Sequence, residues 1–563
     1  MRSMPHKKKY LFLVLFLVFN ILPLIQAQPS PTITTTPIQA QNQKMNVNPS
    51  IPIDMGVNTL HSLGFKGQNI TIAVLDSGID ANDSRFIRED NTSVIERSVS
   101  FLEENGTIYE DEYDYNGHGT IVSGLIGSVY SDVVKTWGPT GAPSPPSRMG
   151  GIAPNATLWS LKVLDGEGSG SIQYLINALE YVYMNRDKID IISLSLGALD
   201  MEIEPLSDVI DRCIDAGIFI LSAAGNEGGT DKPHFYTIAT PSNHLRVLSV
   251  GNVIDNTYIA SSSSNGPTRS GLYKPEIMVP GTLILSTYLN NSHAYSSGTS
   301  LSTPIAVGAL ACILSGLHNR SQYSYEDIII SILQSSELLD DYIDPYMQGV
   351  GIPNFYQAWQ SLINKNTKIA SVPTQFTFPN IFASAGEFRE YYKLDYMRAT
   401  IVVSERLAFP LSIELNDTLE SVIVLRDLDE ILNSGYHVLG VDFKAPPLFT
   451  LQHVYEGSIL FYDAEFDLIY TIEITCQFST WFLIRRHTGF ILIFILAIVS
   501  VLLIIEYRAR NKNKLKIIEK LNDLGIIQCP KKAVCECDPE TGFCKIKYVN
   551  QKLTLKKNEH INL

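Results

Sequence analysis

The sequence predicts an α/β domain with a mostly parallel sheet, followed by a β-rich domain and a single transmembrane helix. Three observations predict this order. Continuous apolar runs such as residues 71–76 are typical of buried parallel strands, and segments with helical spacing lie between them. After about residue 365 the pattern changes to short β-rich runs separated by turn residues. Near the end, residues 489–505 form a run of 17 residues without a charge.

The first residues have the three parts of a secretory signal. Residues 7–9 are lysines, residues 10–19 are apolar, and the small residue Ala27 marks the expected cleavage site. An uncleaved membrane anchor is the alternative. Residues 28–52 are rich in Pro, Thr, Gln and Asn, a composition typical of disordered segments. We therefore predict a signal peptide over residues 1–27 and a disordered linker over residues 28–52.

Two folded domains are expected to follow. We assign residues 53–364 to the α/β domain, in which a helix over 171–186 with apolar residues at helical spacing covers the sheet. Residues 365–484 hold the β-rich runs, and about 120 residues of this kind predict a β-sandwich.

Four polar residues lie where predicted strands end or helices begin. Asp76 ends the strand 71–76, at the edge where open α/β sheets present functional groups. His118 and Ser300 each stand at the start of an apolar helix, and Asn226 follows a β-rich strand at a glycine turn. Alone, each would be a cap, loop or turn residue. Together they supply a hydroxyl nucleophile, its base, an orienting acid and an amide that can donate to an oxyanion.

The chain order Asp76, His118, Ser300, each beside small or glycine residues, resembles that of the subtilisin-type serine proteases, the subtilases. Further blocks resemble the family in family order, so that the resemblance covers about residues 58–319; they are residues 151–164, 166–171, 191–197 and 274–281. It implies a subtilisin-like three-layer domain with Ser300 as the nucleophile. Ser302 lies two residues into the helix and does not match the family pattern.

The resemblance also implies the roles of the other residues. His118 would act as the base, Asp76 would orient it, and Asn226 would donate to the oxyanion. The substrate is implied to be a protein or peptide, bound in extended form by residues of a strand and a glycine turn: Ser195, Leu196, Gly197 and Gly168.

Two features depart from the family. Its members typically carry a folded propeptide between signal and catalytic domain, and residues 28–52 are too few to form one. Residues 131–149 occupy the place of a loop that often binds calcium in the family, but Asp132 is their only acidic residue. No metal site is therefore carried over, and no cofactor is expected.

The chain contains seven cysteines, which fall into two groups. Cys213, Cys312 and Cys476 precede the uncharged run and are too scattered to predict a disulfide framework. Cys213 and Cys312 lie in helix-like segments and are interpreted as buried apolar residues rather than reactive thiols. The other four form a cluster for which metal binding, free thiols and lipidation all remain open; they are Cys529, Cys535, Cys537 and Cys544.

Charge and sequon patterns predict an orientation in the membrane. Residues 506–563 hold 13 Lys and Arg against 7 Asp and Glu, a net charge of +6, whereas the rest of the chain holds 30 against 51, or −21. The positive-inside rule therefore places the tail 506–563 in the cytoplasm and the catalytic domain outside. Eight Asn-x-Ser/Thr sequons all precede the span, in agreement: Asn69, Asn82, Asn91, Asn105, Asn155, Asn290, Asn319 and Asn416. The basic tail fits anionic lipid headgroups, and no nucleic-acid partner is expected.

The sequence thus predicts a single-pass protein of the cell membrane that is a serine endopeptidase working through an acyl-enzyme. The alternative is a catalytically silent ectodomain that binds a peptide or partner in the same cleft. A receptor-like protein that signals through its cysteine-containing tail is a third possibility.

Overall fold

The computed structural model describes residue 44 and residues 46–478, with gaps at 104–106, 112, 199–200, 202, 230–232, 341–342, 382–396, 406, 408–410, 416, 427–432 and 444–453. Beyond residue 478 it describes residues 493, 495–512, 516, 520, 533–537, 544–548 and 551–552. The predicted signal peptide 1–27 and residues 28–43 of the predicted linker lie outside the described residues.

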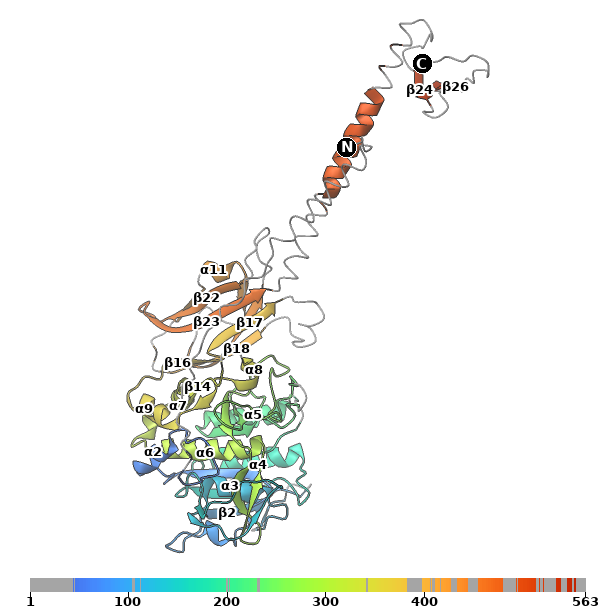
Figure 1. Ribbon diagram of the computed structural model, residues 1–563. Helices are drawn as coiled ribbons and strands as arrows, with labels where there is room; N and C mark the ends of the chain where they lie inside the picture. Colours follow the sequence, from blue (N-terminus) through green and yellow to red (C-terminus); the bar gives the residue numbers. More distant parts are fainter. Residues whose placement is uncertain are drawn as a thin grey trace. The chain divides into compact units, whose positions relative to one another are not determined.

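An eight-stranded sheet forms the centre of the α/β domain (Figure 1), with strand order β11-β10-β9-β8-β1-β7-β2-β3. Every pairing is parallel except that of β2 with β3, so the sheet is mostly parallel, as predicted. The strands are β1 (Thr71–Asp76), β2 (Ile95–Ser100), β3 (Tyr109–Glu110), β7 (Thr157–Lys162), β8 (Ile191–Leu194), β9 (Phe219–Ala223), β10 (Leu248–Val253) and β11 (Ile277–Pro280). Strands β8 to β11 are buried throughout, as expected for parallel strands that are covered on both faces, and they consist mainly of apolar and small residues.

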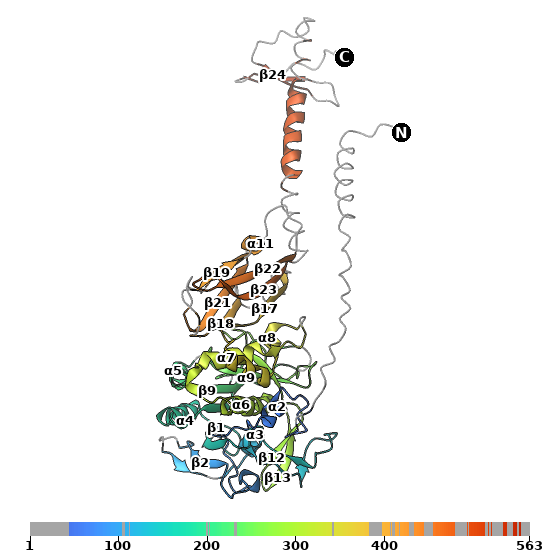
Figure 2. The same ribbon diagram turned by 90° about the vertical axis from the view of Figure 1, so that its left-hand side faces the viewer.

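Helices cover both faces of this sheet. Figure 2 shows α4 (Ile172–Met184) and α5 (Glu204–Asp215) on one side of β1 and β9, with α3 (His118–Gly127) and α6 (Thr299–Ser315) on the other. The predicted helix 171–186 is therefore present as α4, and it buries Leu175, Ala178, Leu179 and Val182 against the core. Helix α6 is apolar on all sides and is buried from Leu301 to Leu314, as expected for the central helix of a domain.

Shorter elements complete the α/β domain. The remaining helices are α2 (Val57–Ser62), η2 (Ser84–Phe86), η3 (Arg320–Gln322), α7 (Tyr325–Gln334), α8 (Pro345–Gln348) and α9 (Phe355–Ile363). The remaining strands are β4 (Ser131–Asp132), β5 (Thr136–Trp137), β6 (Arg148–Met149), β12 (Ile284–Tyr288), β13 (Ser292–Ser296), β14 (Ser336–Glu337) and β15 (Ile352–Pro353).

The end of the predicted linker belongs to the folded domain. Asn48 and Ile51 are fully buried, and the Asn48 side-chain amide donates to the carbonyl of Leu285 at 2.9 Å. The N–H of Leu285 in turn donates to the Ser50 hydroxyl at 2.9 Å. Residues 46–52 therefore pack against β12, which composition alone could not show, because their partners lie more than 200 positions away.

The β-rich region contains two four-stranded sheets, with orders β16-β18-β21-β20 and β17-β23-β22-β19. The elements are β16 (Ile369–Val372), β17 (Gln375–Ile381), β18 (Met397–Val403), β19 (Ser412–Leu415), α11 (Asp417–Glu420), β20 (Ile423–Arg426), β21 (Gly435–Phe443), β22 (Val454–Tyr462) and β23 (Leu468–Phe478). The Ser404 hydroxyl donates to the buried Asp327 carboxylate of α7 at 2.6 Å, which joins this region to the α/β domain. The β-sandwich packing stays a prediction.

The predicted span 489–505 falls only partly on described residues. Residues 495–512 are helical. Among the helices that the structure describes, none combines the length and the apolar composition needed to cross a membrane. In the tail, β24 (Ala533–Cys537), β25 (Cys544–Tyr548) and β26 (Gln551–Lys552) form a small sheet that the sequence did not predict.

Candidate active site

Asp76 and His118 are brought together by the end of β1 and the start of α3. Asp76 is 1% exposed, and its Oδ1 lies 2.8 Å from His118 Nδ1. The N–H of Ser77 donates to the same oxygen at 2.7 Å. Because a carboxylate can only accept, His118 Nδ1 carries the proton and Nε2 is left as an acceptor.

The charge of Asp76 controls the protonation of His118. This carboxylate raises the pKa of His118 above its usual value, against the opposing effect of burial, and Asp114 adds to the rise. Asp76 Oδ2 is buried and has no hydrogen-bond partner among the described residues. The imidazole is thus paired to one oxygen of a buried carboxylate, an arrangement that stabilises its protonated form.

Asp114 holds the loop that presents His118. Its Oδ1 accepts from the Ser77 hydroxyl at 3.0 Å and from the N–H groups of Asn116 and Gly117 at 3.0 and 2.8 Å. Its Oδ2 accepts from the N–H and hydroxyl of Thr120 at 2.9 and 2.7 Å. Sequence reasoning missed this residue, although its spacing before Asn116 and Gly117 is a signal of a turn bonded by an aspartate side chain.

A close backbone approach lets β1 and α3 meet at this point. A Cβ added to Gly119 would lie 2.0 Å from the carbonyl oxygen of Gly78. Gly117, which precedes the helix, has a φ of +97°, a conformation that glycine adopts without strain. Glycines on either side of His118 are therefore required by the packing.

Ser300 lies in the first turn of α6. Gly298 precedes it with a φ of +149°, and a Cβ at Gly298 would lie 3.3 Å from both the Ser300 hydroxyl and the Asn226 amide. The absence of a side chain therefore keeps the space between these two groups open. Ser302 is fully buried, whereas Ser300 is partly exposed, so that only Ser300 can meet a substrate.

The carbonyl of Ser300 has an unusual partner. Pro304 lies four residues further along α6 and has no N–H, so it cannot make the helical hydrogen bond to this carbonyl. The hydroxyl of Ser195 donates to the Ser300 oxygen instead, at 2.9 Å. Ser195 follows β8, so this bond links the first turn of α6 to the central sheet.

Asn226 presents a free amide beside Ser300. Its Oδ1 accepts from the N–H of Thr299 at 3.0 Å and from the Thr299 hydroxyl at 3.2 Å. Because a backbone N–H can only donate, these bonds identify the oxygen and leave Nδ2 as a donor without a partner among the described residues. The N–H of Ser300 makes no hydrogen bond outside α6 among the described residues, so it is a second available donor. Sequence reasoning missed this donor.

The hydroxyl of Ser300 and His118 Nε2 form no hydrogen bond with each other in the described part of the chain. Such contacts are often long in free enzymes and shorten when substrate binds. Asp76 and His118 are therefore already paired, and Ser300 and Asn226 are placed together around Gly298.

The predicted substrate-binding residues lie on two segments. Ser195 is buried, Leu196 is half-buried and Gly197 is exposed, directly after β8. Gly168 is exposed in the turn after β7, with a φ of +75°. The role of these residues in substrate binding stays a prediction, since no ligand is present.

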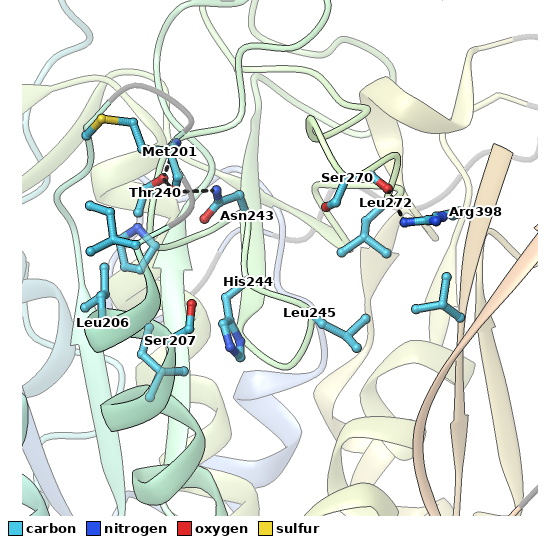
Figure 3. A pocket seen from close by; sticks show the side chains of 14 residues that line it. Met201, Leu206, Ser207, Thr240, Asn243, His244, Leu245, Ser270, Leu272 and Arg398 are labelled. Carbon is cyan, nitrogen blue, oxygen red and sulfur yellow. Dashed lines mark hydrogen bonds between the residues drawn. The ribbon is translucent and has the colours of Figure 1, made fainter. Parts of the chain in front are cut away.

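Two cavities lie away from these residues. One of about 300 Å³ has α5 on one side and β18 on the other, and its lining includes Leu206, His244 and Arg398 (Figure 3). Another of about 390 Å³ is lined by residues that include His61 and Tyr130. Neither contains a predicted catalytic residue, which is expected if an extended peptide binds along an open surface rather than in a closed pocket.

Metal and thiol chemistry find no support in the described residues. No group of three or more His, Cys, Asp or Glu side chains that could hold a metal ion is found there. Cys213 and Cys312 are fully buried, and burial raises the pKa of Cys213 to about 12. Both are inert apolar residues, as predicted.

Comparison with known proteins agrees with this geometry. A sequence model of the Subtilase family matches residues 67–351. Subtilisin E of Bacillus subtilis (strain 168) is 32% identical over 256 residues, which are 46% of this chain and 58% of that protein. Subtilisin of Bacillus pumilus is 32% identical over 256 residues, 80% of its length, and the minor extracellular protease Epr of Bacillus subtilis (strain 168) is 33% identical over 250 residues, 33% of its length. The chain thus spans little more than half of subtilisin E.

Proposed function

Because this chain belongs to the subtilase family of serine peptidases, we propose that it is an endopeptidase that hydrolyses peptide bonds through an acyl-enzyme. The observation that carries the proposal is the 2.8 Å hydrogen bond between His118 Nδ1 and Asp76 Oδ1. It leaves Nε2 as a base on the residue that begins α3, and α3 lies on the same side of the sheet as α6, whose first turn contains the partly exposed Ser300 (Figure 2).

In the first half of the reaction, the Ser300 oxygen attacks the carbonyl carbon of the substrate while His118 Nε2 takes the hydroxyl proton. The charge of Asp76 stabilises the imidazolium that forms. Negative charge develops on the carbonyl oxygen, where Asn226 Nδ2 and the N–H of Ser300 donate. The carbon–nitrogen bond then breaks, and His118 returns the proton to the leaving amine.

In the second half, a water molecule replaces the amine. His118 Nε2 takes a proton from the water, whose oxygen attacks the acyl carbon, and the same two donors stabilise the charge. Collapse of this intermediate releases the carboxylic acid product, and the proton returns to Ser300. The positive end of the α6 dipole lies at Ser300 and favours both charged intermediates.

The test is covalent labelling with a fluorophosphonate, which reacts with an activated serine. We expect the wild-type chain and Ser302→Ala to be labelled, because Ser302 is buried, and Ser300→Ala to remain unlabelled. Hydrolysis of a casein substrate should follow the same pattern. A wild-type chain that is neither labelled nor active would refute the enzyme and leave a silent peptide-binding ectodomain, and labelling lost only in Ser302→Ala would refute the choice of nucleophile.

We further propose that the chain is anchored in the cell membrane, with the catalytic domain outside and the tail in the cytoplasm. The uncharged run 489–505 supports this proposal, as do the sequons that all precede it. The basic residues directly after the run favour the cytoplasmic side and contact with anionic lipids: Arg508, Arg510, Lys512, Lys514, Lys516 and Lys520.

Extraction of membranes with alkaline carbonate tests the anchor. We expect the chain to stay in the membrane pellet, and a variant with Leu496→Arg and Val499→Arg to be released, because two charges in the run oppose insertion. Release of the wild-type chain would refute the anchor. Labelling of intact cells by a membrane-impermeant fluorophosphonate tests the orientation, and labelling only after permeabilisation would reverse it.

A further inference from the structure

The side chain of Asn116 connects the catalytic histidine with the turn that contains Gly168. Asn116 Oδ1 accepts from the backbone N–H of His118 at 3.2 Å. Asn116 Nδ2 donates to the carbonyl of Gly166 at 3.1 Å. The two ends of one amide therefore contact two segments that lie about 50 residues apart and that the proposed reaction must hold together.

The turn on the Gly166 side has a defined shape. The carboxylate of Asp165 accepts from the N–H groups of Glu167 and Ser169 at 2.9 and 3.0 Å, and the N–H of Asp165 donates to the Ser169 carbonyl at 2.8 Å. A Cβ at Gly168 would lie 3.2 Å from Asn116 Nδ2. The turn is thus closed by its own hydrogen bonds and packs directly against the Asn116 amide.

The base of the turn is attached to the other catalytic residue. The N–H groups of Val163 and Leu164, which follow β7, donate to the backbone carbonyl of Asp76 at 2.9 and 3.2 Å. The turn therefore has one attachment at Asp76 and a second at His118 through Asn116. Only the second depends on a side chain, so it can be removed by substitution.

We propose that Asn116 is a positioning residue that sets the distance between the bound peptide and the His118 imidazole. This inference rests on the proposed function and on the binding of substrate at the Gly168 turn. A peptide that pairs with the turn is then held in place relative to Nε2, which is the atom that must receive the proton from Ser300. A short substrate that does not reach the turn gains less from this connection.

The two ends of the amide can be separated by substitution. Asn116→Asp keeps an oxygen that accepts from the His118 N–H, but it replaces the donor to the Gly166 carbonyl with a second acceptor. Asn116→Ala removes both contacts. Asn177→Ala is the matched control, because Asn177 is an amide on α4 whose only side-chain partner among the described residues is Gln173.

The experiment measures kcat and KM for a six-residue peptide amide and for p-nitrophenyl acetate, with the full chain and each variant. Titration with a fluorophosphonate gives the active fraction, so that loss of folded protein is not counted as loss of rate. Because Asn116→Asp adds a charge near His118, the comparison is made on the plateau of the pH profile.

For Asn116→Asp we expect kcat/KM to fall about fivefold more for the peptide than for the ester, mainly through KM, which is the loss of about one hydrogen bond. Asn116→Ala should lower kcat for both substrates as well, and Asn177→Ala should match the wild type. Equal losses on peptide and ester with Asn116→Asp, or no loss with either variant, would overturn the proposal. A wild-type chain that is neither labelled nor active would instead refute the proposed function, so the two failures are distinguishable.

Discussion

The hydrogen bond between Ser195 and the Ser300 carbonyl leads to a prediction that involves a third residue, Pro304. In Ser195→Ala this carbonyl loses the one partner that it has outside the helix in the described part of the chain. A hydrogen bond of this type contributes about 1 kcal/mol net, and up to about 3 kcal/mol is lost when a buried acceptor is left unpaired. The carbonyl is partly buried, so we expect a loss of about 1 kcal/mol of stability. The freed first turn of α6 should also slow fluorophosphonate labelling several-fold.

Pro304→Ala supplies the test, because it restores an N–H at the position that normally bonds to the Ser300 carbonyl in a helix. In that background Ser195→Ala should have little effect, since the carbonyl now has a helical partner. A double-mutant cycle should therefore give a coupling energy of about 1 kcal/mol between Ser195 and Pro304.

The cycle is measured by urea unfolding of four proteins that all carry His118→Ala, which prevents self-digestion. Labelling rates come from the same four proteins with His118 intact. If Ser195→Ala destabilises the chain equally with Pro304 and with Ala at position 304, the reasoning is wrong, and Ser195 does not compensate for the missing N–H.

Three further predictions concern charged or titrating groups. Asp76 is the main cause of the raised pKa of His118, so Asp76→Asn should move the acid limb of the kcat/KM profile to lower pH. The same substitution should reduce the plateau of kcat/KM by roughly three to four orders of magnitude. An acid limb that stays in place in the pH profile would contradict this prediction. His293 is fully buried without a partner for either ring nitrogen among the described residues, and burial lowers its pKa from 6.5 to about 4. As pH falls, the unfolded chain therefore binds the proton before the folded chain does, and the free energy of unfolding should fall by roughly 3 kcal/mol as pH drops from above 6.5 to 4. His293→Phe should flatten this pH dependence, as measured by urea unfolding. An unchanged pH dependence in the variant would refute the prediction. Arg85 and Asp83 form a buried ion pair, so Arg85→Leu should destabilise the chain by about 3–5 kcal/mol in thermal and urea unfolding. Adding Asp83→Asn should recover part of this loss. If the effects of the two substitutions simply add, the two charges do not interact.

Local patterns predicted most of the α/β domain. Residues 71–76 form a buried strand and residues 172–184 form a helix, as predicted. A strand that is buried on both faces has a continuous run of apolar residues, and a helix that is buried on one face has apolar residues at helical spacing. The boundary near residue 52 was less predictable. The segment 46–52 is polar in composition, yet it packs against β12 through partners that no local pattern reveals.

The sequence by itself determined which chemical groups are available at the candidate site. Asp76, His118, Asn226 and Ser300 were identified because each stands at a strand end, a turn or a helix start, and such positions are set by local residue preferences. The glycines beside these residues were also informative in the sequence. Close approach of another backbone segment, or a positive φ, excludes residues with a side chain at such positions.

Only the tertiary structure decided how these groups are connected. It paired one oxygen of Asp76 with His118, buried Ser302 while leaving Ser300 partly exposed, and engaged the Asn226 amide oxygen with the Thr299 N–H, so that the amide nitrogen is the group left to donate. The supporting roles of Asp114, Asn116 and Ser195 also emerged only in three dimensions. Hydrogen bonds between distant segments depend on where strands and helices pack, and a pattern along the chain does not contain that information.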